Sequence, residues 1–106
     1  MLYTKVTKDN NQGIVIPVKN VKFDDQYYYM LALSYKDNLA TICIHIEPGN
    51  CVAIDDGDGC SYKIGEQMNQ ITMKKYHLTA MLDVEHEELV IVVPTVFECY
   101  LSDRIL

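Results

Sequence analysis

Short apolar runs, each interrupted by a turn signal, are the feature that most constrains what this chain can fold into. The runs are four to ten residues long and rich in valine, isoleucine and tyrosine, and three prolines and five glycines lie within or between them. Runs of this length and composition are typical of β-strands. The spacing therefore predicts a domain of antiparallel strands, with no internal repeat and no Pro/Gly-rich linker.

The clearest hairpin is predicted between residues 26–35 and 39–47, which are separated by the polar turn Lys36-Asp37-Asn38. Side chains alternate along a strand, so the isoleucines of the second run share one face, and we expect that face in the core. The first run is apolar on both faces. A strand covered on both sides implies a second layer, which could be another sheet, a helix or another subunit.

Other strands are expected at residues 13–18, 51–54, 60–64, 76–84 and 89–93, and a further one through Val21 and Phe23. Pro17 favours a sheet edge for the first of these, because proline cannot donate to a ladder. Residues 51–54 and 60–64 form a second predicted hairpin, and 76–84 and 89–93 a third. The run at 89–93 is continuously apolar, as in a central buried strand. Residues 65–75 fit a helix or a strand, and the pattern does not decide between them.

The C-terminal residues predict a short helix. Thr95 and Glu98 match a capping box, and apolar residues follow at helical spacing up to Ile105. A strand through residues 96–101 is the competing interpretation. We therefore expect one domain over residues 1–106, mainly β, with an antiparallel sheet that forms a sandwich or a partly open barrel and a short C-terminal helix. The alternative is an α+β domain with one helix on the sheet.

Composition narrows the class of protein. Hydrophobic residues make up 49% of the chain and charged residues 23%, which are ordinary values for a globular domain and argue against disorder. No run approaches the roughly 20 apolar residues needed to cross a bilayer, and the chain does not open on a secretion signal. We expect a cytoplasmic protein that does not enter membranes.

The formal charge of −6 is unevenly distributed. Residues 1–50 carry five acidic and five basic side chains, whereas residues 51–106 carry ten acidic and four basic ones, with Arg104 as the one arginine of the chain. Direct binding to nucleic acid needs lysines and arginines that neutralise phosphates, so this class of partner is not expected. An acidic chain suits a basic surface on another protein.

Three groups of residues could carry chemistry. Cys51 and Cys60 could form a disulfide across the Asp-Gly turn, although reduced cysteine suits the expected compartment. Cys43 and His45 share a strand face and could bind zinc or form a thiol nucleophile, although simple packing explains them as well. The turn at residues 55–59 could hold Ca²⁺, but Asp-Gly pairs are also what a tight hairpin needs. No spacing matches an established motif, so we expect neither a metal nor a cofactor.

Tyrosine is over-represented, with eight residues against two phenylalanines and no tryptophan. Tyrosine combines a large apolar ring with a polar tip and is favoured in recognition surfaces. Adjacent tyrosines on a strand cannot all face one core. The expected binding residues are therefore the tyrosines and the carboxylates of the two acidic turns, namely Tyr27, Tyr29, Asp55, Asp56, Asp58, Glu85, Glu87 and Glu88.

These observations predict a non-catalytic protein-binding module. Its partner would present a basic surface and handle nucleic acid, and the module would act as an inhibitor, in the manner of small acidic immunity or phage anti-defence proteins, an analogy that rests on size and charge. The alternative is a homo-oligomeric structural protein that could sequester a small ligand between subunits. A small metal-dependent enzyme is the third hypothesis.

Overall fold

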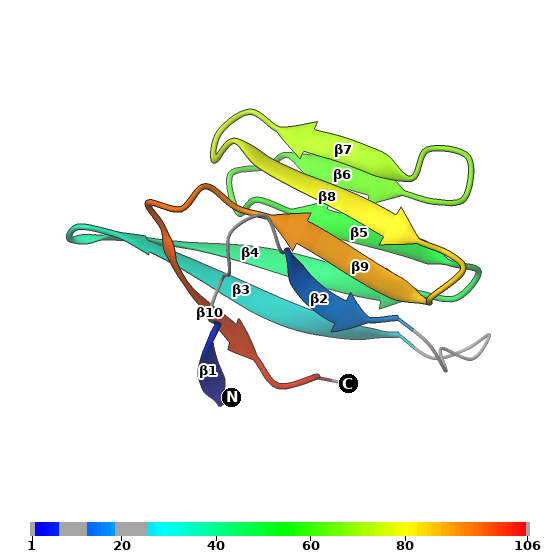
Figure 1. Cartoon of the computed structure of the whole chain (residues 1–106), viewed down its shortest axis with the longest axis horizontal. Helices are drawn as coiled ribbons and strands as arrows, with labels where there is room; N and C mark the ends of the chain where they lie inside the picture. The colour runs from blue at the N-terminus through cyan, green and yellow to red at the C-terminus, as the bar shows by residue number, and fades with distance from the viewer. Residues whose placement is uncertain (1, 7–12, 19–25, 106) are drawn as a thin grey trace.

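The computed structural model describes residues 2–6, 13–18 and 26–105, which form two antiparallel sheets packed face to face (Figure 1). One sheet has six strands in the order β1-β10-β3-β4-β5-β6, and the other has four in the order β2-β9-β8-β7. The strands are β1 (Tyr3–Val6), β2 (Ile14–Pro17), β3 (Tyr27–Tyr35), β4 (Asn38–Glu47), β5 (Cys51–Asp55), β6 (Ser61–Ile64), β7 (Gln70–Met73), β8 (Leu78–Asp83), β9 (Glu88–Val92) and β10 (Glu98–Ser102). Within the described residues, no helix could span a membrane.

The three predicted hairpins are confirmed. β3 pairs with β4, β5 with β6, and β8 with β9, all antiparallel. β2 lies at the edge of the four-stranded sheet, as expected. On its outer side no neighbouring strand needs the N–H group that Pro17 lacks. The undecided segment 65–75 contains strand β7. The strand expected through Val21 and Phe23 lies outside the described residues.

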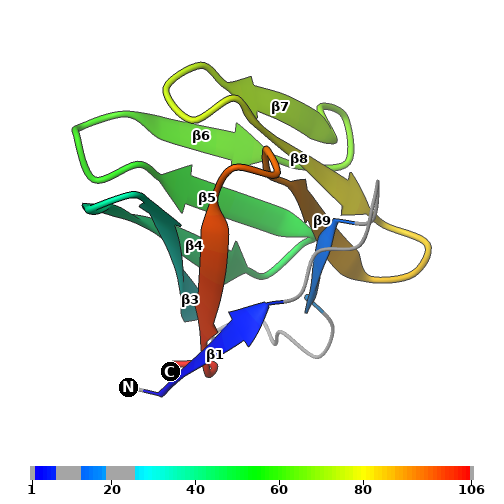
Figure 2. The same cartoon turned by 60° about the vertical axis from the view of Figure 1, so that its left-hand side comes forward.

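The predicted C-terminal helix is absent, and the competing strand takes its place. Residues 94–97 form a turn in which the amide of Phe97 donates to the carbonyl of Pro94, at 3.2 Å. β10 then inserts between β1 and β3 and pairs with both (Figure 2). Cys99 points into the core while Tyr100 points outward. The apolar spacing that suited a helix also suits this alternation, and two neighbouring strands satisfy the backbone better than an isolated helical turn.

The core lies between the two sheets. Large aliphatic side chains alternate inward on both, and burying each of them fully contributes roughly 1.5–3 kcal/mol. Those with almost no exposed surface are Ile16, Leu31, Leu33, Ile42, Ile44, Ile46, Ile54, Ile64, Met73, Leu78, Leu89 and Ile91. The isoleucine face of β4 is thus in the core, as its alternation predicts. β9 is internal in its sheet, but it is not buried on both faces, because Val92 is 42% exposed.

Successive antiparallel strands place their turns alternately at two ends of the sandwich (Figure 1). The aspartate end carries the turns at residues 36–37, 56–60, 74–77 and 93–97. The glutamate end carries those at 48–50, 65–69 and 84–87. Contacts between turns agree with this assignment: Asp58 pairs with Lys75 at the first end, and Asn50 donates to Glu66 at 2.9 Å at the second.

Candidate functional site

Tyr27 and Tyr29 belong to the core, which corrects their assignment to the binding surface. They are 4% and 8% exposed, and their rings meet edge to face with centroids 6.0 Å apart. Both lie on the inward face of β3, so it is Tyr28 that projects outward. Desolvation by burial raises the pKa of both phenols. The Tyr27 hydroxyl donates to the carbonyl of Pro17 at 3.4 Å, and the Arg104 guanidinium lies 4.7 Å from the Tyr27 ring centroid.

The aspartates of the β5–β6 turn hold that turn together. Asp56 is 5% exposed, and its Oδ1 accepts the amide N–H groups of Asp58 and Cys60 at 2.8 and 3.2 Å. Asp55 accepts from the amide of Gly57 at 2.9 Å. Both carboxylates therefore accept hydrogen bonds from backbone N–H groups of their own turn, as aspartate and asparagine commonly do in tight turns. Across the described part of the chain, no group of three or more His, Cys, Asp or Glu side chains is arranged to hold a metal ion.

Cys51 and Cys60 carry free thiols and lie at opposite ends of the β5–β6 hairpin. Cys51 begins β5 and Cys60 precedes β6, so they are separated by the length of a strand, roughly 13–16 Å at about 3.3 Å per residue. A disulfide needs Cα atoms within about 7 Å. The structure therefore excludes the disulfide considered between them.

The two acidic turns lie at opposite ends of the molecule and do not form one patch. At the aspartate end, Lys36, Lys74 and Lys75 stand beside the aspartates, and Lys75 pairs directly with Asp58. At the glutamate end, carboxylates gather from three turns and the strand ends beside them, namely Glu47, Glu66, Asp83, Glu85, Glu87 and Glu88. Among the described residues, the cations at this end are Lys63 on β6 and Arg104, which follows β10 together with Asp103. The excess negative charge is therefore concentrated at the glutamate end.

The β8–β9 turn is a compact acidic projection. The amide of His86 donates to Asp83 Oδ1 at 3.1 Å, and its ring Nδ1 lies 2.8 Å from Oδ2 of the same carboxylate. The backbone hydrogen bond from His86 is the main cause that lowers the pKa of Asp83. Glu87 adopts a left-handed conformation, with φ of 54°, and its carbonyl accepts the amide of Val18 at 3.0 Å. This bond fixes the turn against the end of β2.

Beside this turn, the outer face of the four-stranded sheet is apolar. Register places Val15 opposite Val90 and Val90 opposite Met81, so the three side chains run across three adjacent strands. Val15 and Met81 are 49% and 40% exposed. Together with Val92 on the same face of β9, these residues form what we term the valine patch. Nothing in the described part of the chain covers it.

Two shallow hollows join the valine patch to the acidic turn. One, of about 230 Å³, is lined by Val15, Pro17, His86, Glu87 and Glu88. The other, of about 360 Å³, is lined by Asn69, Gln70, Met81, Leu82, Asp83, Val84 and Val90. Each therefore combines an apolar floor with at least one carboxylate at its rim. An apolar centre with a charged rim is the usual anatomy of a protein-recognition surface.

Of the predicted site residues, the structure places Glu85, Glu87 and Glu88 together on this surface and Asp55, Asp56 and Asp58 at the far end. Sequence analysis missed Asp83, Val15, Met81 and the outward valines of β9. Strand alternation could have shown that Met81 and Val90 point outward, because Met81 lies between the buried Ala80 and Leu82, and Val90 lies between the buried Leu89 and Ile91. Comparison of the chain with protein-family models, with curated proteins and with solved structures found no match.

Proposed function

We propose that this protein is a non-catalytic recognition module that docks the valine patch and the β8–β9 turn on a basic surface of another protein. The observation that carries the proposal is the direct adjacency of apolar side chains and carboxylates in the two hollows, with Glu87 and Glu88 beside Val15 in one and Asp83 beside Met81 in the other. A lysine or arginine of the partner would lay its aliphatic stem on Val15 and Pro17 and bring its charged head to Glu87 and Glu88.

Basic surfaces of this kind are a property of proteins that handle nucleic acid, which makes them the proposed partner class. The module would compete with phosphates for the same lysines and arginines and would thereby inhibit the partner. An immunity or anti-defence role in the cytoplasm is consistent with such inhibition. Nucleic acid itself would be repelled by the glutamate end.

Charge also distinguishes this proposal from homo-oligomerisation. If the valine patch paired with its own copy across a twofold axis, the carboxylates beside it would be brought toward the same carboxylates of the second copy. Like charges facing each other at an interface are unfavourable. The patch and its rim therefore favour a partner of opposite charge over a second copy of this chain.

The test uses the intact protein and two matched triple variants. E85Q/E87Q/E88Q neutralises the proposed surface, and D37N/D55N/D58N removes the same charge at the opposite end. Each is immobilised, exposed to the same cell extract and washed at low and at moderate salt. The proposal predicts a basic protein that is captured by wild type and by the aspartate-end variant, and that is lost with the glutamate-end variant and in salt. Equal capture by both variants would refute it.

Sedimentation of the purified protein provides the second arm. A monomer at micromolar concentration is expected. A stable dimer that the substitution Val15→Lys dissociates would assign the patch to self-association and overturn the proposal.

A further inference from the structure

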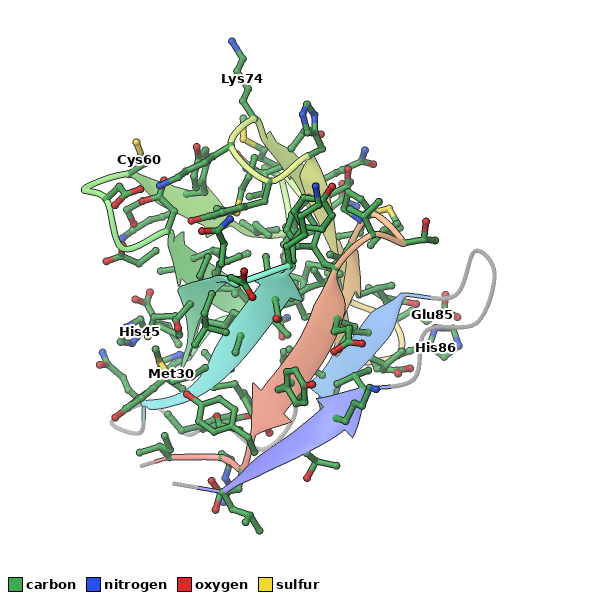
Figure 3. The ribbon with its side chains drawn as sticks, turned by 90° about the vertical axis from the view of Figure 1, so that its left-hand side faces the viewer. Met30, His45, Cys60, Lys74, Glu85 and His86 are labelled. Carbon is green, nitrogen blue, oxygen red and sulfur yellow. The ribbon has the colours of Figure 1, made fainter. Side chains whose placement is uncertain are left out.

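The outer face of the six-stranded sheet, on the other side of the molecule, carries a group of side chains with sulfur and nitrogen lone pairs. Figure 3 shows Met30 and His45 projecting from this face, with Glu85 and His86 on the opposite side of the sandwich. Cys43 and His45 alternate onto the same face of β4, and Cys43 Sγ lies 3.2 Å from His45 Nε2. Met30 on β3 is the register partner of Cys43. A thiol and an imidazole are thereby in contact, with a thioether at the neighbouring position of the adjacent strand.

Register places these three side chains at neighbouring positions on one face of the sheet. Directly opposite residues of an antiparallel pair have Cβ atoms about 4.5–5.5 Å apart, which a methionine side chain spans easily. The ring of Tyr28, the register partner of His45, has its centroid 5.5 Å from that of the imidazole. Met30, Cys43 and His45 are all half-buried, so the donors are partly shielded while solvent still reaches them.

The surroundings argue against a thiol nucleophile at this position. Burial, and second the Asp55 carboxylate, raise the pKa of the Cys43 thiol, so the thiol is not activated as a nucleophile, and a metal ion that binds it has to displace its proton. From Cys43 to Ile46, β4 pairs with β3 on one side and β5 on the other, so the backbone N–H groups around the thiol are engaged in ladders and are not free to stabilise an oxyanion. The same negative potential from Asp55 attracts a cation.

We propose that Met30, Cys43 and His45 form a binding site for a soft monovalent metal ion, Cu(I). Thiolate and thioether sulfurs select Cu(I) over harder ions, and an imidazole completes a three-coordinate set. A structural zinc site takes four ligands from cysteine, histidine, aspartate or glutamate, and among the described residues no three of these side chains are grouped to hold a metal ion. At bond lengths of about 2.0–2.3 Å, three-coordinate geometry separates two ligand atoms by about 3.5–4.0 Å, so Sγ and Nε2, which lie 3.2 Å apart, would move apart by about half an ångström on binding.

Binding exchanges one proton for the metal and involves no redox step. The Cu⁺–S bond forms as the S–H bond of Cys43 breaks, and the proton passes to solvent. The neutral imidazole and the thioether each donate a lone pair and lose no proton. Copper stays in the +1 state throughout, and the charge balances, because one cation replaces another.

The experiment is an anaerobic titration with Cu(I) in competition with a chromophoric Cu(I) chelator. Wild type is expected to bind a single equivalent. Mutating a residue that only orients a metal ligand typically lowers metal affinity about 10–100-fold. C43S removes a ligand itself and is therefore expected to lower the affinity for Cu(I) at least about 100-fold. H45Q and M30L should each lose about tenfold or more. C60S, which removes an exposed thiol at the aspartate end, is the matched control and should bind as wild type does.

Circular dichroism and melting temperature show whether each variant is folded. If C43S does not fold, X-ray absorption of wild type loaded with Cu(I) decides, with two sulfurs and one nitrogen expected around the ion. The proposal is overturned if C43S retains affinity, if C60S loses as much as C43S, or if the ion has another ligand set. Zn²⁺ alone is the second probe, and tight Zn²⁺ binding that depends on the same three residues would also overturn it.

Discussion

Gly13 is expected to control how closely β2 approaches β9, and hence how the valine patch is assembled. A Cβ atom at this position would stand 2.6 Å from Cγ1 of Val90 and 2.9 Å from the carbonyl oxygen of Ile91. Both separations are well inside van der Waals contact, and one of the two atoms is backbone. The substitution Gly13→Ala therefore forces β2 away from its neighbour.

The expected cost follows from two opposing effects. Overpacking of a well-packed site costs about 1–3 kcal/mol. Replacing glycine by alanine restricts the unfolded chain and returns about 0.4–1 kcal/mol. The free energy of unfolding should therefore fall by about 1–2 kcal/mol. Gly65 is the matched control, because its added Cβ would meet no atom within 4 Å, so Gly65→Ala should be neutral or slightly stabilising.

Urea unfolding followed by circular dichroism measures both variants. Gly13→Ala should lower the midpoint without changing the slope m, which reports surface exposed on unfolding. Val90→Ala removes the nearer of the two atoms that the new Cβ would meet. Val90→Ala should therefore lower the free energy of unfolding less in the Gly13→Ala background than in wild type, and the difference between the two backgrounds should be at least about 0.5 kcal/mol. Indistinguishable midpoints for Gly13→Ala and Gly65→Ala would refute the packing described between β2 and β9.

Four further substitutions test local features. His77 has φ of 52°, so His77→Gly should raise the free energy of unfolding by roughly 0.5–1 kcal/mol and with it the urea midpoint, and a lower midpoint would contradict this. Because the pKa of Asp83 is lowered in the folded protein, its stabilisation is present above the unfolded pKa of about 3.9 and lost as pH falls through the folded value. The difference in unfolding free energy between wild type and Asp83→Asn should therefore shrink in acid, and a difference independent of pH would exclude this linkage. Tyr29→Ala should cost about 3–5 kcal/mol in thermal or urea unfolding and Tyr28→Ala much less, and similar losses would argue against the assignment of inward and outward rings.

Local pairing was predictable from the sequence, because hairpins depend on adjacent runs and the turn between them. The C-terminal strand was not, since the pattern at Thr95 and Glu98 satisfies a helix start while β10 is selected by non-local pairing with β1 and β3. The face assignment of the tyrosines could not be settled either. Alternation shows that Tyr28 opposes Tyr27 and Tyr29, but which face meets the second sheet depends on the whole fold.

The separation of the two acidic turns depends on one undecided element. Each antiparallel strand carries the chain from one end of the sandwich to the other, so the number of strands between two turns determines whether they meet. Between the turn at Asp56 and the turn at Glu85 the chain forms β6, β7 and β8. Three crossings place the two turns at opposite ends. With a helix at residues 65–75 in place of β7, the number of crossings would not determine whether the two turns meet. β7 therefore decides which carboxylates can act together.

The central claim is that the glutamate end, and not total charge, directs binding, and the most direct test is the association rate constant with the captured partner as ionic strength rises. Raising salt from about 0.05 to 0.3 M shortens the Debye length to below about 8 Å. The rate should fall about tenfold or more for wild type and for D37N/D55N/D58N. For E85Q/E87Q/E88Q it should be slow at low salt and nearly constant. A rate that does not depend on salt, or that is lost only in the aspartate-end variant, would contradict the account.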